Sequence, residues 1–367
     1  MSRLNARLLD RLRDRARRDV EAGLEFGGVE GCAIAVAHRG EIVWEEGFGA
    51  ARDDTPMMLF SVSKTVLEAV LWRLFSDGLD PDTPVVEIIP EFMDGTQPGI
   101  TIAMVESHLG GFAHQRIDEV DAPNRRARID AFRTWEADRR PGEYEYHPLS
   151  GAWVLAEVIE RVAGRDYRDV LRRDVLSPLG LDDVHLISLG ASEDSLADVL
   201  LHRDHMNGYT PDPGLRARLP YGLDTRAGLA VGVPGVGAVG TASGVALLYQ
   251  AYLHDAIGLW DSSVVADARS RIRVDGPDPA GRPIRRSLSF VVAGAPSERY
   301  GERTFFGPAT SDHSFGHQGQ GGQVAWADPE TGLSFAYLTN TVVFPPGGHF
   351  HPRSRELSAF AARLLED

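Results

Sequence analysis

Segments typical of β-strands lie at the two ends of this chain and are absent from its long middle. Near the N-terminus, residues 32–37 and 41–44 are apolar runs separated by a short polar turn, which predicts a β-hairpin. Three further strand-like runs follow near the C-terminus, at residues 288–293, 322–328 and 333–339. Because the two sets are far apart in the sequence, they predict one antiparallel sheet to which both chain ends contribute.

Helical patterns flank these strands and fill the region between them. Leucines four apart predict an amphipathic helix over residues 3–22, and apolar residues at helical spacing mark another from Leu357 to Leu364. Further helices are predicted from residue 60 to about 75, over 150–163, and from about 167 to a stop at 177–180.

The sequence therefore predicts an α+β fold in which terminal helices cover the sheet and a mostly helical lobe is inserted. We expect an α/β domain from residues 1–78 and 237–367, and a helical domain from residues 79–236. Residues 207–240 are rich in Gly and Pro, which predicts a long ordered surface loop of the kind that often lines a binding cleft.

Charge and cysteine content exclude several classes of function. A net charge of −15 argues against a nucleic-acid or anionic-membrane partner. Cys32 is the only cysteine, so no intrachain disulfide and no cysteine-based zinc site can form. With no metal-binding motif, no cofactor motif, no long apolar segment and a charged N-terminus, we expect a cytoplasmic protein without metal or cofactor. The oligomeric state is left open.

Lysine usage singles out one position. Lys64 is the only lysine, and the remaining 37 basic residues are arginines. An arginine side chain keeps its proton near neutral pH, whereas a lysine can lose its proton in suitable surroundings. The bias suggests that position 64 needs a titratable amine, although compositional drift that left one lysine explains it about equally well.

Ser61 stands three residues before Lys64, where the predicted helix begins. This spacing puts both side chains on one helix face, one turn apart. The helix N-terminus adds unpaired N–H groups and a positive dipole end, which stabilise a developing negative charge. A serine hydroxyl becomes a nucleophile when a neighbouring base accepts its proton, and Ser-Lys pairs are one known arrangement for this chemistry.

Several motifs in the right order resemble those of serine β-lactamases and penicillin-binding proteins. More narrowly, they resemble the class C β-lactamase-like group, which includes family VIII carboxylesterases, D-aminopeptidases and some acyltransferases. The matching segments are Ser61-Val62-Ser63-Lys64, Ile100-Thr101 with His108-Leu109-Gly110-Gly111, Pro141-Gly142-Glu143-Tyr144-Glu145-Tyr146, Pro178-Leu179-Gly180-Leu181 and Gly316-His317-Gln318-Gly319-Gln320-Gly321-Gly322. Each is weak alone, and together they span most of the chain.

The resemblance implies catalytic roles for three side chains. Ser61 would be the nucleophile, Lys64 would hold the proton network, and Tyr146 would act as general base and then as general acid. A phenol has a pKa of about 10 in water, so this role needs a nearby cation, for which Lys64 is the candidate. Without the other motifs, Tyr146 is more simply read as a tyrosine that caps a loop.

The third motif would supply the other wall of the site. The resemblance implies an oxyanion hole formed by the backbone N–H groups of Ser61 and Gln320. Gly319 would let this strand edge approach the substrate, with Gln318 beside it. His317 would lie at the cleft and bond to Tyr146, and a solvated loop histidine is the alternative.

Two departures from the family pattern narrow the substrate. The second motif reads Tyr146-His147-Pro148 where the family usually has Tyr-x-Asn, so the asparagine that contacts the acyl side chain in β-lactamases is missing, and His147 is expected beside the substrate. The third motif has His317 where a lysine would grip the β-lactam carboxylate. Both changes argue against efficient β-lactam hydrolysis.

The sequence thus predicts a serine hydrolase that acts on small carboxylic esters through an acyl-enzyme. The open alternatives are an amidase or D-aminopeptidase, a β-lactamase, an acyltransferase, and a non-catalytic binding module of the same fold.

Overall fold

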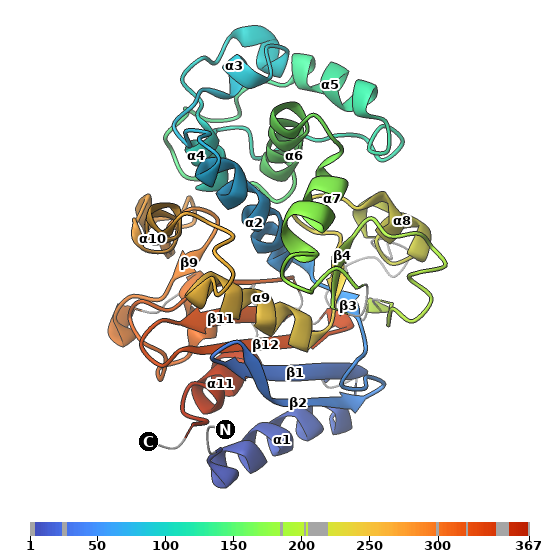
Figure 1. The fold of residues 1–367 in the computed structure, drawn as a ribbon, viewed down its shortest axis with the longest axis vertical. Helices are drawn as coiled ribbons and strands as arrows, with labels where there is room; N and C mark the ends of the chain where they lie inside the picture. Colours follow the sequence, from blue (N-terminus) through green and yellow to red (C-terminus); the bar gives the residue numbers. More distant parts are fainter. Residues whose placement is uncertain are drawn as a thin grey trace.

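The computed structural model describes residues 4–23, 28–183, 186–201, 203–204, 219–298, 301–320, 322–342 and 352–365. Figure 1 shows a layered lower part, in which helices cover both faces of a sheet, and a helical upper part. The two chain ends lie close together below the sheet. The predicted α+β fold, with an antiparallel sheet built from both ends of the chain, is confirmed. The two domain boundaries stay a prediction.

Within the described residues the central sheet has eight strands, and each strand runs antiparallel to its neighbours. Their order is β2-β1-β12-β11-β10-β9-β8-β7. The N-terminal hairpin therefore pairs with the last long strand of the chain, which closes the sheet between the two ends. The bounds are β1 Gly31–His38, β2 Glu41–Gly49, β7 Val274–Pro277, β8 Pro283–Arg286, β9 Val291–Val292, β10 Phe315–Gln318, β11 Val324–Asp328 and β12 Leu333–Thr339.

Side-chain size differs between the two faces of this sheet. Successive residues of a strand point to opposite faces, so alternation along β1, β11 and β12 separates two sets. One face is lined largely by alanines, including Ala35 and Ala336, which lie opposite each other. The other carries large side chains, including Val36, Phe335 and Trp326. The small side chains let a helix approach the sheet closely on one face, and the large ones fill the space under the terminal helices on the other.

Helices from both ends of the chain cover the face with large side chains. They are α1 (Ala6–Glu21) and α11 (Pro352–Ala361) (Figure 1). Leu12 of α1 is fully buried, and Leu4 and Leu8 pack against the same core, which confirms the predicted apolar stripe. On the alanine face, α9 (Ala242–His254) crosses the sheet, where Ser334 Oγ donates to Ala246 O at 2.7 Å.

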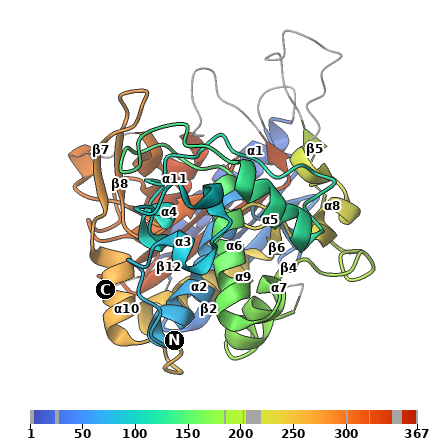
Figure 2. The same cartoon turned by 90° about the horizontal axis from the view of Figure 1, so that it is seen from above.

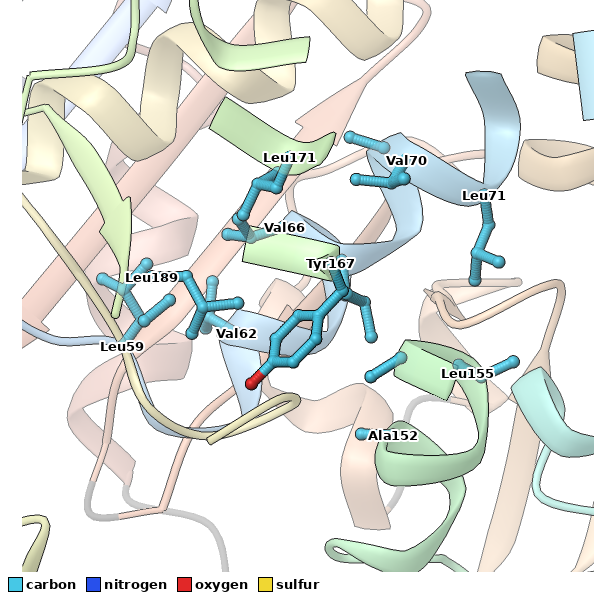
Figure 3. Close-up of a cluster of buried hydrophobic side chains, with 14 of the residues drawn as sticks. Leu59, Val62, Val66, Val70, Leu71, Ala152, Leu155, Tyr167, Leu171 and Leu189 are labelled. Carbon is cyan, nitrogen blue, oxygen red and sulfur yellow. The ribbon is translucent and has the colours of Figure 1, made fainter. Parts of the chain in front are cut away.

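The upper part is built around α2 (Ser63–Ser76), whose residues are buried except for Arg73 and Ser76. A helix that is buried on nearly all sides belongs to the core of the protein. Figure 2 shows α2 beside α6 (Ser150–Ala163) at the centre of the view. Figure 3 shows the cluster that locks α2 against α6 and α7; its labelled residues are Leu59, Val62, Val66, Val70, Leu71, Ala152, Leu155, Tyr167, Leu171 and Leu189.

The remaining elements are short and surround this core. The helices are α3 Val85–Ile88, α4 Ile102–Glu106, α5 Arg125–Thr134, α7 Tyr167–Val170, α8 Arg226–Val231 and α10 Ser262–Ser270, with a π-helical turn at Leu171–Leu176 after α7. Short 3-10 turns lie at Phe60–Val62, Phe92–Gly95, Pro220–Gly222, Pro296–Glu298 and Gly301–Phe306. The short strands are β3 Met57–Met58, β4 Ile187–Leu189, β5 Arg203–Asp204, β6 Ala238–Gly240 and β13 Thr341–Val342.

Two sequence predictions differ from the structure. Of the strand expected at 288–293, only Val291–Val292 forms, because Ser289 has a φ of +53° that breaks the extended backbone before it. The surface loop expected at 207–240 lies partly outside the described residues. Its described end is largely buried and contains α8 and β6. No helix among the described residues is both long enough and apolar enough to cross a membrane.

The terminal helices cover the sheet face that carries Cys32, so the reactivity of this thiol tests their position. Cys32 of β1 is fully buried, and burial raises its pKa to about 12. At pH 8 the group is therefore a protonated thiol, which is not the reactive form. We expect no reaction with Ellman's reagent in the native protein and one thiol per chain in guanidinium chloride. Rapid reaction of the native protein would show that α1 and α11 do not cover the sheet.

Candidate active site

Ser61 lies in the 3-10 turn Phe60–Val62 that leads into α2. Its neighbour Phe60 has a φ of +48°, a strained conformation for a bulky residue that turns the chain sharply before the serine. Val62 N–H donates to Leu59 O at 3.2 Å, so the N–H of Ser61 precedes the first hydrogen bond of the turn. Ser61 therefore combines a partly exposed hydroxyl with the N–H groups of a helix N-terminus.

Lys64 lies one turn further along and is held by three oxygen atoms. Its Nζ donates to Pro148 O at 2.8 Å and to Gly235 O at 3.1 Å, and it lies 3.5 Å from Ser61 Oγ. The side chain is only 7% exposed. An ammonium has three hydrogens, one for each of these oxygens, so the surroundings suit the charged form of Lys64.

Gly235 is required at its position by two constraints. Its φ is +77°, and a Cβ atom there would lie 2.6 Å from Ala152 Cβ and 3.5 Å from Lys64 Nζ. Any side chain would strain the backbone and push against the helix that carries Ala152. The glycine thus lets a backbone carbonyl reach the lysine.

Tyr146 comes to the same point from the helical part of the chain. Lys64 Nζ lies 5.1 Å from the centre of its ring, and the Arg286 guanidinium lies 5.3 Å from that centre. The His108 ring packs against it at 4.4 Å between centroids. No hydrogen bond of the Tyr146 hydroxyl is formed within the described part of the chain. The structure thus brings Lys64 close to both Ser61 and Tyr146, and it shows no hydrogen bond between the phenol and the serine.

Arg286, at the end of β8, is a cation that the sequence motifs did not indicate. It is 1% exposed, and its Nε donates to the hydroxyl of Tyr144 at 3.1 Å. Two positive charges, Lys64 and Arg286, therefore lie near one phenol ring. Both cations are within the range of cation–π attraction to the ring.

A cavity of about 560 Å³ opens in front of Ser61. This volume falls in the range of pockets that hold small organic ligands. Both polar and apolar residues line it: Ser61, Tyr144, Glu145, Tyr146, Pro148, Asp278, Pro279, Ala280, Arg282, Ile284, Arg286, His317, Gln318, Gly319 and Gln320. The turn between β7 and β8 forms one wall, and the end of β10 forms another.

The third sequence motif follows β10 to the cavity. A Cβ atom at Gly319 would lie 2.8 Å from Leu59 O and 3.0 Å from Phe60 Cβ, so the strand end passes against the backbone just before Ser61. Gln320 is exposed at the cavity, next to Gly319. The predicted neighbours Ser61, Gln318, Gly319 and Gln320 thus line one pocket, as expected, while Gly321 lies outside the described residues.

His317 is held differently from the expected bond to Tyr146. Its Nδ1 lies 2.6 Å from Gln318 O, and its ring centre is 6.3 Å from that of Tyr146. Burial, followed by the charges of Arg286 and Lys64, lowers the pKa of His317 well below its usual value. The ring is therefore neutral, donates from Nδ1 to Gln318 O and leaves Nε2 as an acceptor at the cavity.

The structure places His147 behind the cavity wall, not on it. The side chain is fully buried, and its Nε2 accepts from Phe112 N–H at 3.3 Å. Its own N–H donates to His108 Nδ1 at 3.2 Å. Because a backbone N–H occupies the ring nitrogen, this histidine supports the loop that carries Tyr146 and makes no contact with a ligand in the cavity.

Comparison with known proteins agrees with this geometry. The family model described as Beta-lactamase matches residues 16–360. "Esterase/beta-lactamase LipL" of Mycobacterium tuberculosis is 25% identical over 88% of this chain and 79% of its own. A penicillin-binding protein homologue from Caulobacter crescentus is 26% identical, with a TM-score of 0.77 over 95% of this chain and 96% of its own. A family VIII carboxylesterase superposes with the same TM-score and coverage at 22% identity, a likeness of fold.

The buried histidine behind the cavity gives a pH-dependent prediction. Burial lowers the pKa of His147 to about 4, whereas an unfolded histidine titrates near 6.5. The unfolded chain therefore binds an extra proton between these values. The stability that His147 contributes is complete above about pH 6.5 and falls by up to about 1.4 kcal/mol per pH unit as the pH drops towards 4.

The difference between wild type and His147→Gln isolates this contribution, because glutamine can keep the acceptor for Phe112 N–H. Urea unfolding of both proteins at pH 7, 6 and 5 measures it. We expect the wild-type advantage to shrink with each step. A constant difference would mean that folding does not shift the pKa of His147.

Proposed function

This chain belongs to the beta-lactamase family, and we propose that within it the chain is a serine hydrolase that cleaves small carboxylic esters through an acyl-enzyme at Ser61. One observation carries the proposal: the only lysine of the chain lies 3.5 Å from the hydroxyl of Ser61 and beside the ring of Tyr146, and both Ser61 and Tyr146 line a ligand-sized cavity. A purely structural lysine would have no need of this placement.

In the acylation step, Ser61 Oγ forms a bond to the ester carbonyl carbon while its proton passes to the Tyr146 oxygen. The ionised phenol that accepts this proton is stabilised by Lys64 and Arg286. The carbonyl oxygen becomes an oxyanion, held by the N–H groups of Ser61 and Gln320. The carbon–oxygen bond to the alcohol then breaks, and the alcohol takes the proton from Tyr146.

Deacylation reverses these roles with water. A water molecule gives a proton to Tyr146 and attacks the acyl carbon, and the second oxyanion uses the same two N–H groups. When the bond to Ser61 Oγ breaks, the serine recovers its proton from Tyr146. The acid leaves, and the enzyme returns to its starting state.

The walls of the cavity favour an ester over a β-lactam. In place of the lysine of the third motif stands His317, which is neutral. In place of the asparagine of the second motif stands Pro148, which lines the cavity and offers no amide to an acyl side chain. The cavity also has room for a small acyl group and its alcohol. The name of LipL, which includes both activities, supports a hydrolase of this range.

The first test removes the nucleophile. Ser61→Ala should reduce the hydrolysis of short p-nitrophenyl esters to background and abolish labelling by a fluorophosphonate probe, because no acyl-enzyme can form. Ser262→Ala, at an exposed serine that begins α10, serves as control and should keep both. Labelling that persists in Ser61→Ala would disprove the assignment.

Substrate classes are separated on the wild-type enzyme. We expect p-nitrophenyl acetate and butyrate to react faster than nitrocefin or D-alanine p-nitroanilide. If nitrocefin or the anilide reacted fastest, the enzyme would be a β-lactamase or an amidase with the same nucleophile. Absence of any labelling or turnover would favour a binding module.

The second test removes the hydroxyl of Tyr146 and keeps its ring. Tyr146→Phe should retain the packing against His108 and therefore the folded structure. General acid–base catalysis commonly contributes about 10²–10⁴-fold, so kcat for ester hydrolysis should fall by that order. Stopped-flow release of p-nitrophenol measures acylation directly. A variant with wild-type acylation would show that another group takes the serine proton.

A further inference from the structure

A second, very small cavity lies in the core next to Lys64. Its volume is about 10 Å³, which is near the lower limit for one water molecule. Its polar lining consists of Lys64 and Glu68 of α2, Glu106 at the end of α4, His108 and Ser289. It is closed off by Leu67, Leu71, Val105 and Leu155, so the polar groups are the exception in an apolar shell.

Glu68 and Glu106 are carboxyl groups that the proposed reaction does not use. Glu68 is fully buried and Glu106 is 1% exposed. Trp72 Nε1 donates to Glu68 Oε1 at 2.6 Å. Within the described part of the chain, Glu68 Oε2, both oxygens of Glu106 and His108 Nε2 have no hydrogen-bond partner of good geometry. Burying polar atoms without partners is costly, and an internal water can supply partners.

Both carboxyl groups are buried and line the same small cavity, so two negative charges there would be unfavourable. Burial raises the pKa of Glu106 well above its usual value, and the negative charge of Glu68 raises it further. Burial also raises the pKa of Glu68, but the neighbouring side chains of Glu106, Ser289 and Trp72 oppose that rise. The arrangement therefore favours a protonated Glu106 beside an ionised Glu68.

We propose that Glu68 and Glu106 share one proton and carry one buried negative charge, which an internal water in the small cavity connects to the ammonium of Lys64. The pair is a positioning element for the catalytic lysine. It keeps Lys64 charged, and so keeps the lysine donating to Ser61 Oγ and facing Tyr146. This rests on the proposed function for its catalytic meaning, but the electrostatic link can be measured without any substrate.

Other charged and titratable groups face the pair and must be included. Arg273 acts on both carboxyl groups and is itself paired with Asp267 at 2.5 Å. Tyr252 of α9 lies near Glu68, and its pKa is raised well above 10 by burial and by that carboxylate, so it stays neutral. His108 is neutral, because burial and then Arg286 lower its pKa. Lys64 is thus the cation on the catalytic side of the pair, and Arg273 is the cation on the other.

The single lysine makes a direct experiment possible. Protein labelled with ¹³Cε-lysine gives one side-chain NMR signal, which belongs to Lys64 and whose chemical shift reports its charge. Glu106→Gln keeps a neutral donor and the carboxylate of Glu68, so it is the matched control. The double variant Glu68→Gln, Glu106→Gln has nearly the same shape but no charge.

We expect the Lys64 signal of Glu106→Gln to titrate as in wild type. In the double variant Lys64 should lose its proton at a pH about one unit lower, because the buried negative charge that stabilises its ammonium has been removed. The alkaline limb of the pH profile of kcat/KM should move by the same amount. Equal titration of Lys64 in the double variant and in Glu106→Gln would overturn the proposal.

An infrared measurement keeps the proposal falsifiable if the double variant does not fold. The difference spectrum between wild type and Glu106→Gln at pH 7 should contain the C=O band of one protonated carboxyl group. Its absence would overturn the shared proton. The proposed function is judged separately, because wild-type protein that fails to label at Ser61 would refute the hydrolase and leave the Lys64 titration unaffected.

Discussion

The rest of the site depends on the hydrogen bonds that hold the ammonium of Lys64. A buried ammonium is costly unless oxygens replace its hydration. Here two backbone carbonyls do so, from Pro148 in the helical part and from Gly235 in the segment before β6. Because these carbonyls come from distant parts of the chain, the lysine fixes the relative position of three segments. Ser61 and Tyr146 gain their geometry from that arrangement.

The two histidines near Lys64 do not add to its positive charge. His108 and His317 both lie near it and are both neutral, because burial and the charges of Lys64 and Arg286 oppose their protonation. His108 and His317 therefore stay neutral at pH values where an ordinary histidine becomes protonated, and Lys64 and Arg286 stay the two cations near the Tyr146 ring. The proposed role of Tyr146 as a base draws on this setting, because two cations lie near its ring.

Sequence alone predicted the parts that depend on local pattern or on ordered motifs. Strand β12 at 333–339, helix α6 at 150–163 and the meeting of Ser61 with Lys64 follow from periodicity and helical spacing. Arg286 and Gly235 were not predicted, because their roles arise from tertiary contacts between segments without a shared motif. His147 was expected at the substrate because it follows Tyr146. Its side chain instead points into the core, where it accepts a hydrogen bond from the backbone N–H of Phe112, and the sequence gives no signal for this tertiary contact.

Helix α2 explains why charges accumulate in the core of this protein. Ser61, Lys64 and Glu68 recur at intervals of three and four residues, so they follow one face of the turn and helix. The other faces are locked by the apolar cluster of Figure 3, and the helix cannot rotate to expose its polar face. A lysine held in this way needs an anion inside the protein. Glu68, one turn after Lys64 on the same helix, carries a carboxyl group that lines the same small cavity, as does Glu106 of α4.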